Sequence, residues 1–326
     1  MTWKVNTNIF TMVISVALCT YNGEKYIRQQ LDSILSQTMP VDEIVIHDDR
    51  STDSTYEILS WYASQYSQIK LIRNIQNVGY KKNFEEALRD CNGDYIFFSD
   101  QDDVWTKDKV AESVEYLRTT GMYGAFTDAR LINQNGDDMG ITLFSHQQLL
   151  PYIENYLLQK YLFEILCLKG NFVTGATLVI TNTAKELVMP YRTALIMAHD
   201  GWIALKLSSL GKLGYINKSL MSYRIHPKQQ AGLDFSCLKG GGQLIDCFLA
   251  NGNVKNLLQM RRSTASIIHV CDFRKKEKEK LFLTYRRLFD KCLKRKSYCT
   301  QIGYKLRFLF MELFVFLRSK SSYRLY

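Results

Sequence analysis

Short apolar runs alternate with longer amphipathic segments through the first hundred residues of the chain. The apolar runs cover 13–19, 43–47, 69–73 and 94–99, a length typical of buried strands. Between them, apolar residues recur at helical spacing over 24–36, 53–66 and 80–91, which predicts three helices. This alternation predicts a parallel, doubly wound α/β sheet, in which ligands collect at the carboxyl ends of the strands.

The pattern after residue 100 is less regular. It predicts helices over 107–118, 151–168 and 197–210, strands over 124–133 and 171–181, and paired short strands over 212–224. The glycines at 240–242 precede further helices. We therefore expect an α/β domain over 1–237, with a mixed, mostly parallel sheet flanked by helices and with halves of about 12–133 and 134–237. A basic helical extension over 238–326 follows.

Composition supports this division. With 46% hydrophobic and 13% aromatic residues, the 326-residue chain can bury a sizeable core. The net charge of +10 is uneven, because residues 238–326 hold 20 of the 42 basic residues but 6 of the 32 acidic ones. The 8 cysteines form no C-x-x-C spacing, and the N-terminus has no signal-peptide pattern. We expect reduced thiols and a cytoplasmic location.

Three carboxylates, Asp100, Asp102 and Asp103, follow the fourth predicted strand. Crowded carboxylates repel one another unless a positive group lies between them, and a hard divalent cation that bridges to a substrate phosphate would serve. Asp100 and Asp102 share side-chain parity if the extended backbone continues, so both could face one ion. The alternative is an acidic turn in which Asp102 or Asp103 caps the next helix.

Polar residues end the other three strands as well, so four loops could together hold a nucleotide. Asp49 could accept a base N–H, Tyr21 could form a wall, Lys82 with a metal could meet the phosphates, and Asp100 could contact the ribose. Any single loop could instead be a turn that caps a helix. No G-x-G-x-x-G follows the first strand and no G-x-x-x-x-G-K-[ST] occurs, which disfavours a nicotinamide-type Rossmann site and a P-loop.

The four loops, in this order, resemble the family-two inverting glycosyltransferases. The motifs are Val16-Ala17-Leu18-Cys19-Thr20-Tyr21-Asn22-Gly23-Glu24, Ile46-His47-Asp48-Asp49-Arg50-Ser51-Thr52-Asp53, Asn77-Val78-Gly79 and Ser99-Asp100-Gln101-Asp102-Asp103. The resemblance covers about residues 12–230 and implies the GT-A fold, a nucleotide-binding sheet fused to an acceptor-binding half. The chain departs from the family at Arg50, where glycine is frequent, so the base preference is not carried over.

The resemblance also implies roles for individual residues. The donor nucleotide would be bound by Thr20, Tyr21, Glu24, Asp49, Asn77, Gly79, Lys82 and Asp100. Asp102 would bind Mn²⁺ or Mg²⁺, and His226, after the last predicted strand, would return to the metal or the diphosphate. A bound cation would neutralise the charge on the departing nucleoside diphosphate.

Asp200 is the residue that the resemblance assigns as general base, taking the proton of the acceptor hydroxyl. Without the family context, an aspartate at a helix start is most simply a cap. The acceptor side would comprise Gly175, Ala176, Thr177 and Trp202. Gly201 stands where close relatives carry an aromatic residue, which suggests a different acceptor wall.

The basic tail contains an apolar run over 304–317 that is interrupted by Glu312. It is too short for a convincing membrane span but fits an interfacial helix on an anionic membrane face. The alternative is a helix packed on the main domain. Nucleic-acid binding is disfavoured, since the tail has no recognisable module and the predicted cleft is acidic.

These features together predict sugar transfer from a nucleotide-diphosphate sugar, with inversion, to a glycan acceptor linked to polyprenyl diphosphate. The setting would be bacterial O-antigen or capsule synthesis, at the inner face of the cell membrane. The motifs look most like the rhamnosyltransferase branch, although glucosyl-, galactosyl- and N-acetylhexosaminyltransferases share them. A nucleotidyltransferase is disfavoured because residues 20–23 form no glycine- and arginine-rich loop. Intact Asp102 and Asp200 disfavour a non-catalytic nucleotide-sugar-binding membrane protein.

Overall fold

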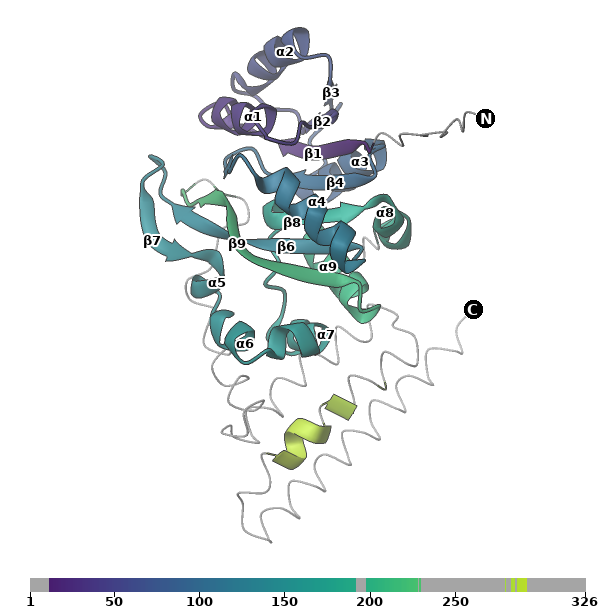
Figure 1. Ribbon diagram of the computed structural model, residues 1–326. Coiled ribbons are helices and arrows are strands. Elements are labelled where there is room, and N and C mark those ends of the chain that lie inside the picture. Colours follow the sequence, from purple (N-terminus) through teal and green to yellow (C-terminus); the bar gives the residue numbers. More distant parts are fainter. Residues whose placement is uncertain are drawn as a thin grey trace, which may run out of the picture.

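A mixed sheet runs through the described part of the computed structural model, which covers residues 12–191, 198–227, 229, 279, 283, 284 and 286–291. Its strands are β1 (Ile14–Thr20), β2 (Glu43–Asp48), β3 (Ile69–Arg73), β4 (Tyr95–Ser99), β5 (Val104–Trp105), β6 (Gly124–Ile132), β7 (Asp138–Thr142), β8 (Leu178–Thr181) and β9 (Leu213–Arg224). They are ordered β3-β2-β1-β4-β8-β6-β9-β5, with β7 beside β6 (Figure 1).

Strand direction divides the sheet into a regular and an irregular part. The block β3-β2-β1-β4 is parallel throughout. β8 runs against β4 and β6, while β9 runs with β6. β5 and β7 run against their neighbours β9 and β6. The predicted mixed, mostly parallel sheet is therefore confirmed.

Helices cover both faces of this sheet, as the doubly wound pattern predicts. They are α1 (Ile27–Leu35), α2 (Thr55–Gln65), α3 (Tyr80–Asp90), α4 (Lys109–Thr120), α5 (Leu143–His146), α6 (Leu150–Glu154), α7 (Leu157–Lys169), α8 (Asn182–Val188) and α9 (His199–Ser209), with a 3₁₀ turn η1 at Gly175–Thr177. Within the described ranges, no helix is long and apolar enough to cross a membrane.

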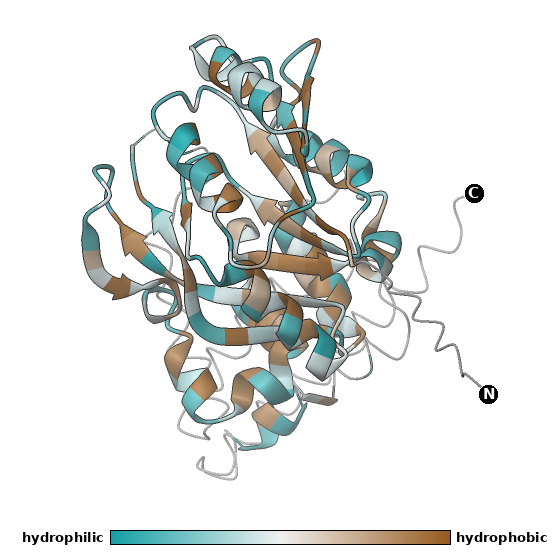
Figure 2. Cartoon of the chain, turned by 45° about the horizontal axis from the view of Figure 1, so that its top comes forward, coloured by the Kyte–Doolittle hydropathy of each residue, from teal (hydrophilic) through white to brown (hydrophobic). Residues whose placement is uncertain are grey.

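The core lies in two layers because side chains of a strand alternate between faces. Val16 and Leu18 of β1 join the apolar cluster beneath α1, α2 and α4. Ala17 and Cys19 join the opposite cluster, beneath α3, α7 and α9. Hydrophobic colouring follows the central strands, while the helices carry hydrophilic outer faces (Figure 2). Burial of both faces explains why the strands of the parallel block read as continuous apolar runs.

Two predicted strands differ in the structure. Residues 171–177 are not part of a strand, because Asn171 bonds the backbone of Val173 and Thr177 bonds that of Thr174. The strand β8 therefore has only four residues. The paired strands expected over 212–224 are the single strand β9. Its pairing with β6 shifts register near Asp128, so the irregular polar pattern marks bulges rather than a hairpin turn.

The helix predicted over 151–168 is also divided. Tyr156 adopts a left-handed conformation with φ of 55°, so α6 ends before it and α7 begins after it. A further kink lies at Tyr161. Of the predicted tail, the structure describes only residues between 279 and 291, and the apolar run over 304–317 lies outside the described residues.

Candidate active site

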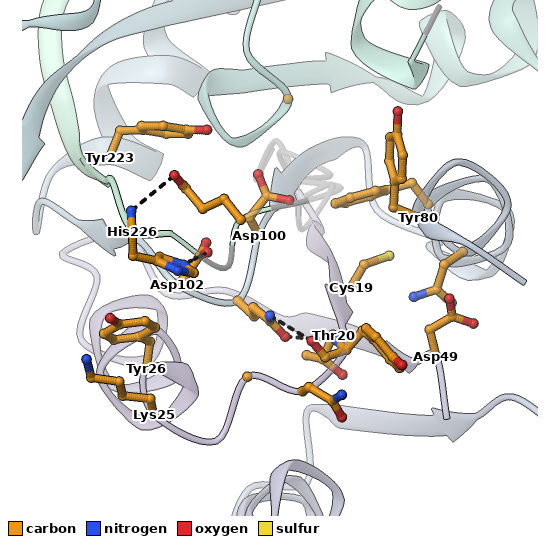
Figure 3. Close-up of a pocket in the computed structure, with 18 of the residues that line it drawn as sticks. Cys19, Thr20, Lys25, Tyr26, Asp49, Tyr80, Asp100, Asp102, Tyr223 and His226 are labelled. Atoms are coloured by element: carbon orange, nitrogen blue, oxygen red, sulfur yellow. Dashed lines mark hydrogen bonds and ion pairs between the residues drawn. The ribbon is translucent and has the colours of Figure 1, made fainter. Parts of the chain in front are cut away.

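A cavity of about 910 Å³ opens at the carboxyl ends of β1, β2 and β4, where the sequence predicts ligand binding. Figure 3 shows that side chains from both halves of the chain point into it. It is lined by Cys19, Thr20, Tyr21, Asn22, Gly23, Glu24, Lys25, Tyr26, Asp49, Asp53, Tyr80, Asn83, Phe84, Asp100, Gln101, Asp102, Gln134, Thr174, Gly175, Ala198, His199, Asp200, Tyr223, His226, Pro227 and Gln229.

The side chain of Gln101 links the loop after β1 to the acidic turn, residues 100–103. The Tyr21 N–H donates to Gln101 Oε1 at 2.8 Å, and Gln101 Nε2 donates to the Tyr21 carbonyl at 3.0 Å. A Cβ at Gly23 would lie 2.2 Å from Gln101 Oε1, so a larger residue there would have to displace the Gln101 side chain from this pair. The aromatic wall and the acidic turn are thus held at a fixed separation.

Asp49 is buried on the same cavity, and its carboxylate is oriented by the loop after β3. Oδ1 accepts from Val78 N–H at 2.8 Å and from Asn74 Nδ2 at 2.9 Å, and Oδ2 accepts from Gly79 N–H at 2.9 Å. Asn77 donates to the Asp49 carbonyl. Asn77 and Gly79 therefore act on Asp49 and do not line the cavity themselves.

Three other predicted donor residues are placed differently from one another. Thr20 lines the cavity and donates to Asp48 Oδ1 at 3.1 Å. Glu24 lies at the rim, where Oε2 accepts the Ser54 N–H at 2.9 Å and so holds the start of α2. Lys82 lies on α3 outside the lining, with its ammonium 3.0 Å from Glu85 and 3.8 Å from Glu86. Its expected contact with a diphosphate has no support in this arrangement.

Arg50 occupies the position at which the sequence departs from its family pattern. Its φ is 66°, in the left-handed region that favours glycine. The side chain is exposed and does not line the cavity. The departure therefore changes the loop surface and not the wall of the cavity.

The acidic turn meets the end of β9. Asp102 Oδ2 lies 2.8 Å from His226 Nε2, so the two residues predicted to share a cation are brought together across 124 positions of sequence. Asp103 is fully buried, and its Oδ1 accepts the Arg224 N–H at 3.0 Å. The buried Arg224 guanidinium donates to the Asp102 carbonyl at 2.8 Å. These two hydrogen bonds from Arg224 therefore hold the acidic turn in place.

Asp100 lines the cavity near Asp102, the predicted metal ligand, and Asp200, the predicted base. Burial, and then the negative charges of Asp102 and Asp200, raise the pKa of Asp100 to about 7. Carboxylates crowded in this way favour a cation. Asp102 and His226 are oxygen and nitrogen ligands suited to Mn²⁺, with the remaining positions left to phosphate oxygens and water. Among the described residues, no three His, Cys, Asp or Glu side chains are grouped to hold a metal.

Asp200 lies in the first turn of α9 and lines the same cavity. Its Oδ1 accepts from Asn171 Nδ2 and its Oδ2 from the Gly175 N–H, each at 3.1 Å, and the Gly201 N–H also donates to it. Burial raises the pKa of Asp200 to about 6, although these hydrogen bonds lower it. The hydrogen bonds thus orient the carboxylate, and the raised pKa makes it a stronger base than an ordinary aspartate.

Only one of the four predicted acceptor-side residues lines the cavity. Gly175 does, and a Cβ there would lie 2.7 Å from His199 Nε2. Ala176 and Thr177 are buried in η1 behind it. Trp202 is buried in the core, with Nε1 donating to the Val188 carbonyl at 2.9 Å. Trp202 therefore supports α9 from inside and forms no acceptor wall.

The buried residue Lys109, at the start of α4, forms a hydrogen bond to η1. Lys109 Nζ donates to the Ala176 carbonyl at 2.6 Å and lies 4.4 Å from the Trp105 ring centroid. Burial lowers the pKa of Lys109 to about 7, against the attraction of Asp103 and Asp100. Its donation holds η1, the turn from which the Gly175 N–H reaches Asp200.

Sequence reasoning missed Gln101, Asn171 and Lys109, which position other residues. Gln101 sits inside the acidic motif, but its two bonds to Tyr21 span 80 positions and leave no local pattern. The contact of Asn171 with Asp200 spans 29 positions and that of Lys109 with Ala176 spans 67. Only the placement of a polar residue next to an apolar segment could have drawn attention to them.

Comparison with known proteins gives a consistent result. The model of glycosyl transferase family 2 matches residues 15–176. The dTDP-rhamnosyl transferase RfbG of Shigella flexneri is 30% identical over 67% of this chain and 75% of its own length. The putative teichuronic acid biosynthesis glycosyltransferase TuaG of Bacillus subtilis is 34% identical over 38% of this chain. That match spans about half of TuaG, 49% of its length.

The fold also matches solved structures. The mannosyltransferase PcManGT from Pyrobaculum calidifontis, in complex with GDP-Man and Mn²⁺, aligns over 96% of this chain and 84% of its own, with a TM-score of 0.50 and 15% identity. At this identity the match supports the fold alone. The strand order, the two helical layers and this match agree with the GT-A-like fold expected from the sequence.

Proposed function

The chain belongs to glycosyl transferase family 2, and from this premise we propose that it transfers a sugar from a nucleotide-diphosphate donor to a glycan acceptor, with inversion. One observation supports the proposal most directly: the loop after β1, the acidic turn and Asp200 all line a single cavity. A nucleotide-binding module without catalysis would not need an oriented, basic carboxylate in the same cavity as the acidic turn.

Asp200 is proposed as the general base. Its Oδ atoms are held by Asn171 and Gly175, so the carboxylate is oriented before substrate arrives. It takes the proton of the acceptor hydroxyl as that oxygen attacks the anomeric carbon of the donor sugar. The bond from the anomeric carbon to the phosphate oxygen breaks, and the nucleoside diphosphate leaves with the electron pair. A single displacement of this kind inverts the anomeric configuration.

Tyr21, Asp49 and Asp100 are proposed to bind the nucleotide. Tyr21 supplies an aromatic surface for the base, and the Asp49 carboxylate accepts an N–H from it. Asp100 faces the ribose. Because Gln101 ties the Tyr21 backbone to the acidic turn, the base and the diphosphate would be held in register with each other.

Asp102 and His226 are proposed to hold a divalent cation, Mn²⁺ or Mg²⁺, which would stabilise the negative charge of the departing diphosphate. The 2.8 Å contact between their side chains supports this pairing. Arg224, below the turn, keeps the Asp102 backbone in place. The similarity in fold to PcManGT, solved with GDP-Man and Mn²⁺, points in the same direction.

Rhamnose is the donor sugar that we propose, on the basis of the similarity to RfbG over two thirds of the chain. We propose a polyprenyl-diphosphate-linked glycan as acceptor, in bacterial cell-surface polysaccharide synthesis at the inner face of the membrane. Both named relatives are transferases, and TuaG is named for teichuronic acid biosynthesis. Glucosyl, galactosyl and N-acetylhexosaminyl donors are the alternatives.

The test is a screen of nucleotide sugars against the full-length protein, with Mn²⁺ and with Mg²⁺. Release of the nucleoside diphosphate is measured for dTDP-rhamnose and for the UDP-hexose and N-acetylhexosamine donors. We expect turnover with one donor class, fastest with dTDP-rhamnose. Turnover with a UDP-sugar alone would overturn the choice of rhamnose. No turnover with any donor, combined with nucleotide binding, would favour the non-catalytic alternative.

A further inference from the structure

Three aromatic rings line the cavity beside the proposed base. Tyr80 and Phe84 belong to α3, and His199 begins α9 directly before Asp200. Tyr80, which is labelled in Figure 3, and Phe84 are four residues apart, so they lie on the same side of α3. We call Tyr80, Phe84 and His199 the aromatic wall. The proposed mechanism uses none of these three residues.

The rings of the wall pack against one another and against the core. The His199 ring centroid lies 4.1 Å from that of Phe84 and 5.4 Å from that of Phe98, with an interplanar angle of 28° in both pairs. Phe84 and His199 are 3% and 7% exposed, and Phe98 is fully buried. Because Phe84 and Phe98 belong to the apolar cluster of this layer, the wall is anchored in the core and has a defined shape.

The imidazole of His199 presents an apolar surface. Both of its nitrogens are buried and have no hydrogen-bond partner among the residues that the structure describes. One side of the ring is closed by Gly175, where a Cβ would lie 2.7 Å from Nε2. Burial lowers the pKa of His199 to about 3, so the ring is uncharged at neutral pH. His199 therefore offers no accessible nitrogen to a ligand in the cavity.

The donor sugar has to lie beside this wall for the proposed reaction to occur. Its anomeric carbon must lie between the hydroxyl that Asp200 deprotonates and the departing diphosphate. The sugar ring therefore occupies the part of the cavity next to Asp200, whose neighbour in the chain is His199. Tyr80 is close to the same carboxylate, since burial and then the negative charge of Asp200 raise the pKa of Tyr80. A sugar seated for attack thus meets the aromatic wall.

We propose that the aromatic wall packs against the C6 methyl group of the donor sugar and so selects 6-deoxyhexoses over hexoses. The inference deepens the proposed function and rests on it, because it concerns the donor of the same reaction. A methyl group buries apolar surface against Phe84 and His199. A hexose would bring its C6 hydroxyl against the same rings, where it would lose its bonds to water without an accessible partner. Rhamnose is a 6-deoxyhexose, whereas glucose, galactose and the N-acetylhexosamines carry this hydroxyl.

Pairs of donors that differ only at C6 test the proposal in the full-length protein. The pairs are dTDP-L-rhamnose with dTDP-L-mannose, GDP-D-rhamnose with GDP-D-mannose, and UDP-6-deoxy-N-acetylglucosamine with UDP-N-acetylglucosamine. Affinity is measured by calorimetry with Mn²⁺, and kcat/KM by release of the nucleoside diphosphate. For the pair that binds most tightly, we expect a preference of about 10- to 100-fold for the 6-deoxy donor, the usual effect of an apolar pocket on an added hydroxyl. Equal values within that pair, or a preference for the 6-hydroxy donor, would overturn the proposal.

His199→Leu and His199→Asn form a matched pair of variants, since leucine and asparagine have similar shapes and differ in polarity. His199→Leu keeps the wall apolar and should keep the preference. His199→Asn introduces an amide that can bond the C6 hydroxyl, so the preference should fall about tenfold. Each preference compares two donors on one variant, so any change in rate that is common to both donors cancels. If the two variants had the same preference, the polarity of the wall would not select the donor and the proposal would be wrong.

Tyr80→Leu and Tyr80→Asn repeat the comparison at a partly exposed position of the wall, where the fold tolerates substitution better than at the buried His199. The expected result is the same, and an equal preference in these two variants would count against the wall in the same way. Failure of the proposed function is recognised separately. A preference in affinity without release of nucleoside diphosphate from any donor would contradict the transferase and support the wall. Turnover without a preference would contradict the wall alone.

Discussion

Two opposing effects act on the pKa of the Asp200 carboxylate. Three hydrogen-bond donors stabilise its charged form, yet burial outweighs them and the pKa rises to about 6. A cap would need only one such bond from the first turn of the helix. The bonds from Asn171 and Gly175 come from outside α9 and fix the direction in which the carboxylate points.

Replacing Asp200 by asparagine should separate the two interpretations of this residue. The asparagine oxygen could still accept from Asn171 and the Gly201 N–H, while its NH2 group would take the place of the oxygen that accepts the Gly175 N–H. The side chain could no longer take a proton. Turnover should fall by about 100- to 10,000-fold, while donor affinity measured by calorimetry stays unchanged. If Asp200 were only a cap, Asp200→Asn would retain its activity, because asparagine caps as well as aspartate.

The pH dependence of the wild type follows from the same group. A base must be deprotonated to act, so kcat/KM should decline as the pH falls through about 6, the pKa of Asp200. An aspartate with an ordinary pKa would keep its activity well below that value. A rate profile in buffers of constant ionic strength measures the midpoint, and a flat profile down to about pH 4 would contradict the assignment.

Asp102 should govern the binding of the cation. With Asp102→Ala, His226 would be the only remaining member of the pair. We expect the thermal stabilisation of the wild type by Mn²⁺ with a nucleoside diphosphate to disappear in the variant, and turnover to be nearly abolished. Stabilisation by the nucleotide alone should remain, since Tyr21 and Asp49 are unaltered. Undiminished stabilisation by Mn²⁺ in Asp102→Ala would place the cation elsewhere.

At the scale of elements, the parallel block was predictable and the connection between η1 and α9 was not. Val16 and Ala17 of β1 face opposite apolar layers, so the strand reads as one apolar run and is recognised directly. The segment before β8 contains apolar residues as well, but Asn171 and Thr177 bond the local backbone and prevent extension.

The same contrast between predictable and unpredictable features applies to the candidate site. Tyr21, Asp49, Asp102 and Asp200 lie at element ends, where sequence patterns place ligands. Lys82 lies one helical turn from Glu85 and Glu86, with which its ammonium pairs, and its role at the diphosphate stays a prediction. Contacts of this kind depend on side-chain direction, which spacing alone does not give.

Asn171→Ala tests the connection between η1 and α9. It removes one donor that lowers the pKa of Asp200, so the acid limb of the kcat/KM profile should move to higher pH. Turnover should fall about tenfold or more, the usual effect of losing a hydrogen bond to a charged group. Asn135→Ala, on an exposed turn, is the control. A lower rate with an unshifted acid limb would mean that Asn171 does not act through Asp200.

At the scale of the whole molecule, the described part of the tail is integrated into the main domain. Phe289 is 2% exposed in the cluster beneath α7 and α9. The alternative of a helix packed on the main domain concerns the 304–317 run, which lies outside the described residues and stays a prediction. The apolar cluster beneath α7 and α9 includes residues on both sides of the predicted boundary at residue 237.

Phe289→Ala should lower the free energy of unfolding by about 3–5 kcal/mol, the usual cost of truncating a buried phenylalanine. Leu283, in the same helical segment, is 50% exposed, and Leu283→Ala should change the stability far less. Urea denaturation of both variants measures the difference. Equal effects would show that the segment does not share the core of the main domain.

The late position of β9 in the chain has a consequence for synthesis. His226 follows Asp102 by 124 residues, which a ribosome takes roughly 6 to 25 s to add. His226 is missing throughout that interval, and Asp200 is missing until 98 of those residues have been added. Chains released before residue 200 would therefore lack the proposed general base, whereas chains released between residues 200 and 226 would have it but lack His226.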